Sequence, residues 1–408
     1  MAFVGRAIST AAVVATALAC SGTIVASAAP ASGTCGGPAQ PSRLGSDQLQ
    51  GVSVISACDA WAVGYRFAGL ADVTLAEHWN GRRWKVIATP NEPGATDNRL
   101  VSVSAVSAAD VWAVGSTQSA SSTLIEHWNG SAWSVVAGAS LPCTGCNSTS
   151  GLSSVAARSP ADAWAVGSYL DGPVRRTLIE HWNGSAWRQS RSPSPGVGAG
   201  GFAAVSSLTS VSAVSASSAW AVGSYDIPNV PYPGEAVDRT LILHWNGQAW
   251  SKVASPNRTT SGFDYDELTG VSARRGDAWA VGYYFNAKAA AGRTLTEHWN
   301  GKKWTIVPSP NPPPAGYPAG LSGVTTISGS SAWATGWWDQ PNGARRTFLM
   351  HWNGTRWRQV VSPNPGGTGY ANELTAVSGT SCRDLWAVGY YSGSANGEPA
   401  LGSITARC

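Results

Sequence analysis

Carboxylates and aromatic rings lie close together at two places in the second half of the chain. Residues 263–267 read Phe-Asp-Tyr-Asp-Glu, and residues 337–339 read Trp-Trp-Asp. Paired carboxylates are the acid and base groups of glycoside cleavage. Aromatic faces suit the apolar faces of sugar rings, and carboxylates accept hydrogen bonds from their hydroxyls. These residue types therefore raise two hypotheses, glycan binding and glycoside chemistry.

The candidate ligand-binding residues come from these two runs and from tyrosines in or near the loops that follow a recurring Trp-Ala-Val-Gly segment. They are Tyr225, Tyr232, Asp264, Tyr265, Asp266, Tyr284, Trp337, Trp338 and Tyr391. The acidic cluster at 264–267 has no second placed group for catalysis, so the sequence favours binding of a glycan or another cell-surface or extracellular component. An extracellular carbohydrate-active hydrolase or lyase is the alternative, and a protein–protein interaction scaffold is a further one.

Neither a metal site nor a cofactor site is predicted. All six histidines occupy the same position of one repeated motif, which indicates a structural role rather than convergence on a metal ion. The sequence contains no Gly-x-Ser-x-Gly, His-Glu-x-x-His, Walker or dinucleotide-binding motif.

The charge pattern argues against two classes of partner. Charged residues make up only 12% of the chain, and the net charge of +4 is not concentrated in basic runs. Binding to nucleic acid or to a membrane surface needs such clusters. The expected partner is therefore a glycan or an extracellular protein surface, and we expect the protein to be a monomer.

Residues 1–28 have the pattern of a secretory signal peptide. Arg6 precedes an apolar, Ala-rich stretch that ends in Ala26-Ser27-Ala28, an Ala-x-Ala cleavage site. The residues before Cys20 are a poor match to a lipoprotein box, and a lipid anchor there stays open as an alternative. No later run reaches the ~18 apolar residues of a membrane-spanning helix, so we expect a secreted, extracellular protein.

Two repeated motifs must position the candidate residues. Trp-Ala-Val-Gly, once Trp-Ala-Thr-Gly, begins at Trp61, Trp112, Trp164, Trp220, Trp279, Trp333 and Trp386. His-Trp-Asn-Gly-x-x-Trp begins at His78, His127, His181, His244, His298 and His351. The chain therefore contains seven copies of the first motif and six of the second.

The second motif predicts a β-hairpin. Asn-Gly between two apolar or alternating runs is typical of a two-residue type I′ turn, and such a turn sets the register of both strands. In the first copy Trp79 would then face Arg82, and Glu77 would face Trp84. The two tryptophans would lie diagonally on one face of the hairpin.

Each unit has the pattern of four short strands, with alternating side chains and turn residues between them. A repeat of ~40–50 residues that carries four strands is typical of a propeller blade. The sequence therefore predicts an all-β, seven-bladed β-propeller of four-stranded antiparallel blades. The units lie near 49–99, 100–150, 151–205, 206–266, 267–319, 320–372 and 373–408.

The seventh unit lacks a fourth strand, because the chain stops at Cys408 where the Asn-Gly turn is due. The N-terminal segment, residues 29–48, is predicted to supply this strand between Cys35 and Leu44. The N- and C-terminal strands would thus close the last blade of the propeller at 49–408.

Six cysteines follow the signal peptide, and an even number indicates disulfides in an oxidising compartment. Because the chain ends would meet in the last blade, we expect two bonds across the seam of the ring and one local bond. The expected pairs are Cys35–Cys408, Cys58–Cys382 and Cys143–Cys146. The pairing of Cys35 with Cys58 and of Cys382 with Cys408 stays open.

The two motifs resemble those of secreted bacterial β-propeller repeat proteins that are grouped with kelch and galactose-oxidase-like propellers. The hairpin motif also resembles the Asp-box of sialidase-type propellers, which joins the third and fourth strands. The resemblance covers nearly all of 49–406 and implies a propeller. It implies no activity, because one fold carries many functions.

Loop lengths divide the expected propeller into two faces. The turn between strands one and two and the Asn-Gly turn are nearly constant, whereas the other two connections vary in length from unit to unit. Both variable classes emerge on the same face, which we call the variable-loop face. Binding residues usually lie on variable loops held by a rigid scaffold, so the ligand site is expected there.

Overall fold

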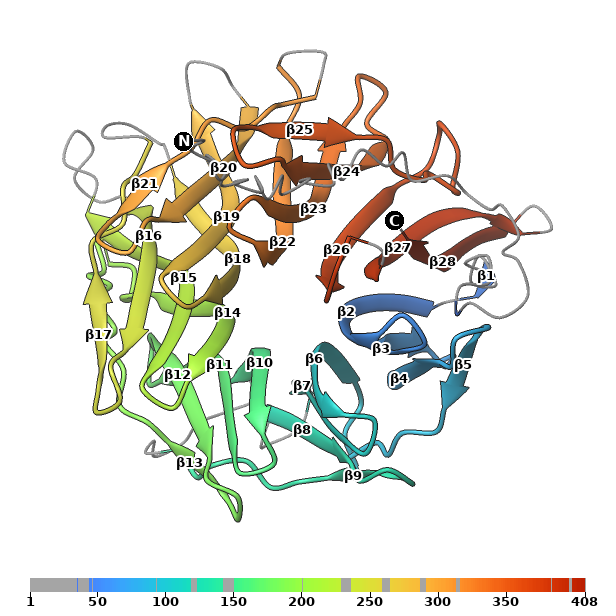
Figure 1. The fold of residues 1–408 in the computed structure, drawn as a ribbon, viewed down its shortest axis with the longest axis horizontal. Coiled ribbons are helices and arrows are strands. Elements are labelled where there is room, and N and C mark those ends of the chain that lie inside the picture. Colours follow the sequence, from blue (N-terminus) through green and yellow to red (C-terminus); the bar gives the residue numbers. More distant parts are fainter. Residues whose placement is uncertain are drawn as a thin grey trace, which may run out of the picture.

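The computed structural model describes Cys35, residues 44–45 and residues 47–407, apart from residues 93, 119–122, 142–149, 200, 229–235, 259–264, 287–290, 313–315, 383 and 396–397. These residues form antiparallel sheets around a central axis, a β-propeller (Figure 1). No helix within the described ranges is long and apolar enough to cross a membrane. The predicted signal peptide, 1–28, lies outside the described residues.

Six units contribute four strands each, and the last contributes three. The first, innermost strands are β2 (Asp47–Ser56), β6 (Asn98–Ser107), β10 (Gly151–Ser159), β14 (Ser206–Ser215), β18 (Asp266–Arg274), β22 (Ala319–Ser328) and β26 (Asn372–Gly379). The second strands are β3 (Asp59–Phe67), β7 (Asp110–Thr117), β11 (Asp162–Asp171), β15 (Ser218–Pro228), β19 (Asp277–Asn286), β23 (Ser331–Asp339) and β27 (Leu385–Ala395). The third strands are β4 (Asp72–Trp79), β8 (Thr123–Trp128), β12 (Val174–Trp182), β16 (Ala236–Trp245), β20 (Ala291–Trp299), β24 (Arg345–Trp352) and β28 (Glu398–Arg407). The fourth strands are β5 (Trp84–Ile87), β9 (Trp133–Val135), β13 (Trp187–Gln189), β17 (Trp250–Val253), β21 (Trp304–Ile306) and β25 (Trp357–Val360).

Six blades are four-stranded antiparallel sheets built from consecutive strands, such as β2-β3-β4-β5. In the last sheet the order is β1-β28-β27-β26, where β1 is the two-residue strand Leu44–Gly45. Leu44 pairs with Gly402, and Gly45 pairs with Leu401. The described pairing between the N-terminal segment and the last sheet is therefore short.

The last sheet lies beside the first blade. Thr375 Oγ1 donates to Leu49 O at 2.9 Å, and Val54 N donates to Ser378 Oγ at 3.1 Å. A central channel of about 340 Å³ is lined by residues from the first strands of all seven units. These strands thus surround one axis, and their small side chains fit the crowded centre.

Tryptophans wedge blades 1 to 6 against one another and the last sheet against blade 1. The ring of Trp61 in blade 1 lies 5.0 Å from that of Trp128 and 5.3 Å from that of Trp133 in blade 2. The same two contacts recur between consecutive blades up to blade 6, and between the last sheet and blade 1. Such aromatic pairs contribute about 0.5–1.5 kcal/mol each beyond the area that they bury. The repeated indole rings therefore hold the blades together.

The predicted register of the hairpin is wrong. Trp79 pairs directly with Trp84, so the connection is a four-residue loop rather than a two-residue turn. Asn80 Oδ1 accepts hydrogen bonds from the backbone N–H groups two and three residues later, both at 3.1 Å. Gly81 adopts φ 84°, a conformation that favours glycine. The asparagine side chain organises the longer loop, to which the two-residue rule does not apply.

Each histidine packs within its own blade. The rings of His78 and Trp61 have centroids 4.5 Å apart, and His78 Nε2 lies 2.8 Å from Asp59 Oδ1. Aspartate takes the place of Asp59 in three other blades, and Ser218 and Ser331 take it in the remaining two. In the described part of the chain, no group of three His, Cys, Asp or Glu side chains could hold a metal ion.

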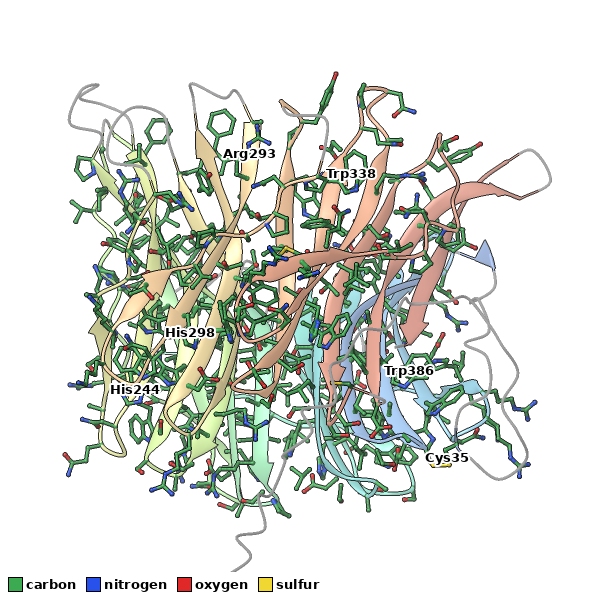
Figure 2. All side chains as sticks on the ribbon, turned by 45° about the horizontal axis from the view of Figure 1, so that its top comes forward. Cys35, His244, Arg293, His298, Trp338 and Trp386 are labelled. Carbon is green, nitrogen blue, oxygen red and sulfur yellow. A yellow bond between two sulfur atoms is a disulfide. The ribbon has the colours of Figure 1, made fainter. Side chains whose placement is uncertain are left out.

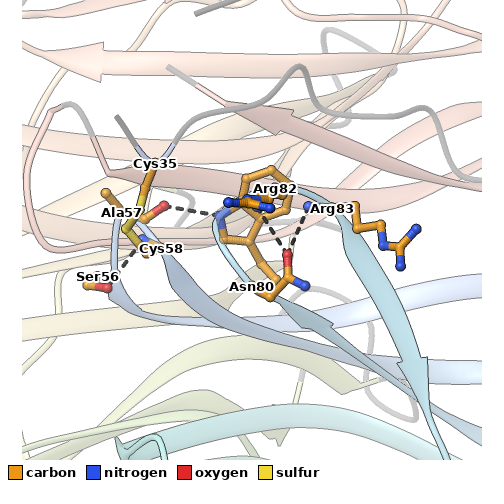
Figure 3. The surroundings of a disulfide bond; sticks show 8 residues. Cys35, Ser56, Ala57, Cys58, Asn80, Arg82 and Arg83 are labelled. Carbon is orange, nitrogen blue, oxygen red and sulfur yellow. Dashed lines mark hydrogen bonds between the residues drawn. A yellow bond between two sulfur atoms is a disulfide. The ribbon is translucent and has the colours of Figure 1, made fainter. Parts of the chain in front are cut away.

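The predicted disulfides across the seam are wrong. Cys35 is bonded to Cys58, with Cα atoms 5.1 Å apart (Figure 3). The reason is positional, because Cys35 lies beside the turn between β2 and β3, which carries Cys58. Cys382 is also disulfide-bonded. Its partner lies outside the described residues, as do Cys143, Cys146 and Cys408.

Candidate functional site

The two ends of the ring carry different connections, as the loop lengths predict. Trp79 Nε1 donates to Ala57 O at 3.0 Å, which places the hairpin of blade 1 beside the turn between β2 and β3. The variable connections emerge at the opposite end. Figure 2 shows Arg293 and Trp338 toward this variable-loop face and Cys35 toward the other end.

A tyrosine bonded to an acidic or amide side chain marks this face in three units. The pairs are Tyr65 Oη with Gln48 Oε1 at 2.8 Å, Tyr283 Oη with Glu267 Oε2 at 2.5 Å and Tyr390 Oη with Glu373 Oε2 at 3.0 Å. Each tyrosine directly follows the Ala-Val-Gly segment and faces the second residue of the first strand. The repeat thus places the same kind of group at the same height in several blades.

Among the described candidates, Tyr265 on blade 5 is the most exposed, at 36%. Its ring stacks on Phe285 with centroids 5.4 Å apart and an interplanar angle of 11°, and it meets the edge of Tyr283 at 5.9 Å. Glu267 joins the group through the Tyr283 hydroxyl. We call these four residues the blade 5 platform.

Carboxyl groups from two blades influence each other at this platform. Burial raises the pKa of Glu267, the hydrogen bond from Tyr283 lowers it, and Asp238 of blade 4 raises it. Burial and then Glu267 raise the pKa of Tyr283, so its phenol stays protonated and donates. Burial and Asp226 raise the pKa of Asp238, against the opposing charge of Arg239. The platform therefore joins an aromatic face to carboxyl groups that can bond hydroxyls.

Asp266 is buried and serves the backbone. It is 0% exposed, and its Oδ1 accepts a hydrogen bond from Arg258 N at 3.2 Å. The equivalent side chains of Asn98, Ser206 and Asn372 accept the same kind of bond from the loop that enters their blades. Because Asn and Ser side chains accept the equivalent loop hydrogen bond in other blades, Asp266 acts as a loop cap.

Protein groups cover the ring of Trp337. The Arg345 guanidinium lies 3.7 Å from the ring centroid, and a Cβ atom added to Gly320 would lie 3.2 Å from the ring. Asp339 at 3.0 Å and Glu373 at 2.9 Å hold Arg345 in place. Trp337 is therefore part of a packed cluster between blade 6 and the last sheet.

The other described candidates contribute to packing. Tyr391 is 7% exposed and belongs to the core between blade 6 and the last sheet. Tyr225, Tyr284 and Trp338 are half-buried, each against a different interblade core. These four residues thus lie on four blades and form no common cluster.

Tyr232 and Asp264 lie outside the described residues. Phe285 was not a candidate, because only tyrosines were taken from the ends of the second strands. Alternate residues of a strand share a face, so the spacing of Tyr283 and Phe285 is the signal that could have found it.

A cavity of about 470 Å³ is a second feature of the variable-loop face. It lies between blades 2 and 3, and its polar lining includes Ser116, Thr117, Ser153, Ser168 and Arg175. None of the sequence-predicted candidates lines it. The cavity and the blade 5 platform are therefore separate features of the same face.

Solved structures of carbohydrate-active proteins share the architecture. The chain is similar to an ulvan lyase of polysaccharide lyase family PL25, with 9% identity and a TM-score of 0.56 over 90% of this chain and 94% of the lyase. A structure of a PL25 ulvan lyase bound to -[GlcA(1-4)Rha3S]- gives a TM-score of 0.55 at 9% identity, over the same shares of both chains. A GH74 xyloglucanase from Xanthomonas campestris gives a TM-score of 0.50 at 11% identity, over 88% of this chain and 54% of the xyloglucanase. The chain thus spans about half the length of that enzyme.

No family model and no curated protein matches the sequence. Because the identities to the solved structures are near 10%, the likeness concerns the fold alone. The chain is a β-propeller that resembles the propellers of a GH74 xyloglucanase and a PL25 ulvan lyase.

Proposed function

We propose that the protein binds a glycan, or a glycan-bearing surface component, through the variable-loop face. The observation that carries this proposal is the blade 5 platform, where the exposed Tyr265 ring lies on Phe285 beside Glu267. An aromatic face can stack on the apolar face of a sugar ring, and a carboxyl oxygen beside it can bond the ring hydroxyls. The site residues of this proposal are Tyr265, Glu267, Tyr283 and Phe285.

The solved structures support a carbohydrate as the class of partner. One is named as a xyloglucanase and another as an ulvan lyase, and a structure of the latter kind contains a bound saccharide. Since fold does not determine function, this support is weaker than that of the platform itself.

A carbohydrate-active enzyme is the second candidate. Glu267 has a raised pKa, which suits a general acid. The raised pKa of Tyr283 argues against a tyrosinate base. For an enzyme, Glu267→Gln should abolish turnover of an oligosaccharide while binding persists. For a binding protein, neither the wild type nor Glu267→Gln should turn the oligosaccharide over.

Glycan-array binding with matched variants tests the proposal. Tyr265→Ala should weaken binding on the order of tenfold, since an aromatic contact contributes about 1 kcal/mol or more. Tyr370→Ala is the control, because Tyr370 is 42% exposed on a connection of the same face. Equal binding by both variants would contradict the blade 5 platform as the site. Capture of a protein partner that sugars do not displace would favour the scaffold alternative.

We also propose an extracellular location and a seventh blade closed by the N-terminal segment. The Cys35–Cys58 bond supports the extracellular location, because disulfides persist in oxidising compartments. The pairing of Leu44–Gly45 with β28 supports the closure. Deleting residues 29–45 in a Cys58→Ser background should lower the melting temperature below that of Cys58→Ser alone. An unchanged melting temperature would rule out a structural role for the segment.

A further inference from the structure

The side chain that follows Ala-Val-Gly, or Ala-Thr-Gly in blade 6, changes in character around the ring. It is aromatic in blades 1, 5 and 6 and in the last sheet, at Tyr65, Tyr283, Trp337 and Tyr390. It is serine in blades 2, 3 and 4, at Ser116, Ser168 and Ser224. The cavity of about 470 Å³ lies where two of these serines are neighbours, and both line it. Serine in place of an aromatic ring leaves space at this position.

Hydroxyl groups supply most of the polar lining of this cavity. Ser116 and Thr117 come from blade 2, and Ser153 and Ser168 come from blade 3. The cross-strand partner of Ser168 is Gly151, so no side chain fills the position that Glu267 or Glu373 takes in other blades. The volume lies in the range of about 300–1,000 Å³ that is usual for small-molecule sites.

One charged side chain, Arg175, belongs to the described lining. Its Nη1 donates to Ser168 Oγ at 3.0 Å, which orients the guanidinium on the blade 3 side. On the blade 2 side, Thr117 Oγ1 donates to Glu92 Oε2 at 3.3 Å. The cavity therefore has a cationic side, and its hydroxyl groups come from both blades.

We propose that this cavity binds one acidic sugar residue of a glycan, a uronic acid, with Arg175 on the carboxylate and the serine hydroxyls on the sugar hydroxyls. Guanidinium groups bind planar carboxylates through paired hydrogen bonds, and a hydroxyl-rich wall exchanges donors and acceptors with a sugar. The inference rests on the proposed glycan-binding function and specifies a second contact on the same face, separate from the blade 5 platform.

The repeat supplies the variant that tests this site. Ser168→Tyr introduces the residue that blades 1 and 5 and the last sheet carry at this position, and the absence of a side chain at Gly151 leaves room for it. The phenol ring would fill the cavity in a form that the fold already accepts. Ser224→Tyr makes the same change in blade 4, where the residue does not belong to the cavity lining. Ser168→Tyr should melt within a few degrees of the wild type. Because Ser224 is 8% exposed, overpacking should lower the melting temperature of Ser224→Tyr, so the variants are compared at a temperature where both are folded.

Calorimetric titration with tri- to hexasaccharides of galacturonate, mannuronate and glucuronate, and with xylo-oligosaccharides as neutral matches, gives the readout. At least one acidic series should bind the wild type at least tenfold more tightly than the neutral series. Ser168→Tyr should bind that series at least tenfold more weakly than the wild type, whereas the affinity of Ser224→Tyr should change less than twofold. Arg175→Gln should remove the preference for the acidic sugar.

The outcomes separate this inference from the proposed function. Glycan binding that depends on Tyr265 but is unchanged in Ser168→Tyr would overturn the cavity site and leave the blade 5 platform standing. Equal losses in Ser168→Tyr and Ser224→Tyr, or no preference for acidic sugars, would also overturn it. A wild type that binds no glycan would overturn both.

Discussion

Trp386 of the last sheet packs against Trp79 of blade 1, with ring centroids 4.9 Å apart. A second contact joins Trp386 to Trp84 at 5.1 Å. The geometry repeats that of Trp61 with Trp128 inside the ring, although these partners come from opposite ends of the chain. The seam is thus held by the same aromatic wedge as the interfaces between blades 1 to 6, rather than by the cysteine pairs that were expected there.

Replacing Trp386 should therefore destabilise the whole ring. The side chain is 0% exposed, and truncation of a buried tryptophan costs about 3–5 kcal/mol. We expect Trp386→Ala to lower the free energy of unfolding by that amount in urea denaturation. Val361→Ala, at a residue 70% exposed, should stay within about 0.5 kcal/mol of the wild type. Similar values for the two variants would contradict a structural seam at Trp386.

The hairpin loop of blade 1 depends on one side-chain oxygen. Asn80 Oδ1 accepts two backbone hydrogen bonds, each at 3.1 Å. Asn80→Ala should cost about 1 kcal/mol, because a hydrogen bond contributes about 0.5–1.5 kcal/mol and the loop is exposed. Asn80→Asp keeps an acceptor and should recover most of this lost stability. Thermal unfolding of both variants measures the difference. Equal losses in the two variants would show that the acceptor does not organise the loop.

Four buried glutamates precede the histidines of the hairpin motif, at Glu77, Glu126, Glu180 and Glu297. Burial raises the pKa of Glu126 to about 8, and among the described residues neither of its carboxyl oxygens has a hydrogen-bond partner. Burial likewise raises the pKa of Glu297 to about 8, although a bond from Ser255 opposes this shift. Both groups therefore keep their protons in the folded protein at neutral pH.

The stability of the protein should consequently fall as the pH rises. Below the ordinary pKa of 4.5, Glu126 is protonated in both states and its contribution is fully present. Above it, the unfolded chain ionises while the folded protein keeps the proton until the pH reaches about 8. Each such group then lowers the free energy of unfolding by about 1.4 kcal/mol per pH unit.

Glu126→Gln should remove one such contribution to the slope. Urea unfolding at several pH values between about 5 and 8, the window set by the raised pKa, measures it. Asp171→Asn is the control, since the Asp171 side chain is 44% exposed, and it should keep the wild-type slope. Stability curves for Glu126→Gln and the wild type that run parallel over this window would contradict the prediction.

The strands and their order could be predicted because each signal occurs many times. A tryptophan two residues after Asp or Ser and followed by Ala-Val-Gly, or by Ala-Thr-Gly at Trp333, marks the second strand of each unit. Seven such strands predict a ring. The register of the hairpin could not be predicted, because the Asn80 side chain, rather than a two-residue backbone turn, shapes the loop. The disulfides could not be predicted either, since the position of Cys35 depends on a segment without the repeat.

The candidate site was predictable only in part. The composition of residues 263–267 led to blade 5, but burial could not be read from composition. Asp266 faces a loop backbone while Glu267, the next residue, reaches Tyr283. The cavity between blades 2 and 3 could not be predicted, because small residues such as Ser116 and Ser168 carry no chemical signal in isolation. Aligning the units with one another exposes these serines as departures from the aromatic pattern.

The last prediction separates a loop cap from a catalytic acid. Asp266→Asn keeps the acceptor for Arg258 N, as Asn98 and Asn372 do in their blades. Arg239, whose Nη1 lies 3.9 Å from Asp266 Oδ2, loses a charged neighbour, so a cost of about 1 kcal/mol is expected. Asp266→Ala removes the buried acceptor altogether and should cost about 1–3 kcal/mol more in urea unfolding.

Glycan binding should be unchanged in Asp266→Asn at temperatures where the variant is folded, and weakened in Glu267→Gln. This contrast follows from position, since Asp266 is 0% exposed and Glu267 reaches the aromatic platform. An Asp266→Asn variant with wild-type unfolding but no binding or turnover would instead identify Asp266 as a functional acid. The blade 5 loop would then resemble the paired carboxylates of a glycoside-cleaving site, and the enzyme hypothesis would replace the binding one.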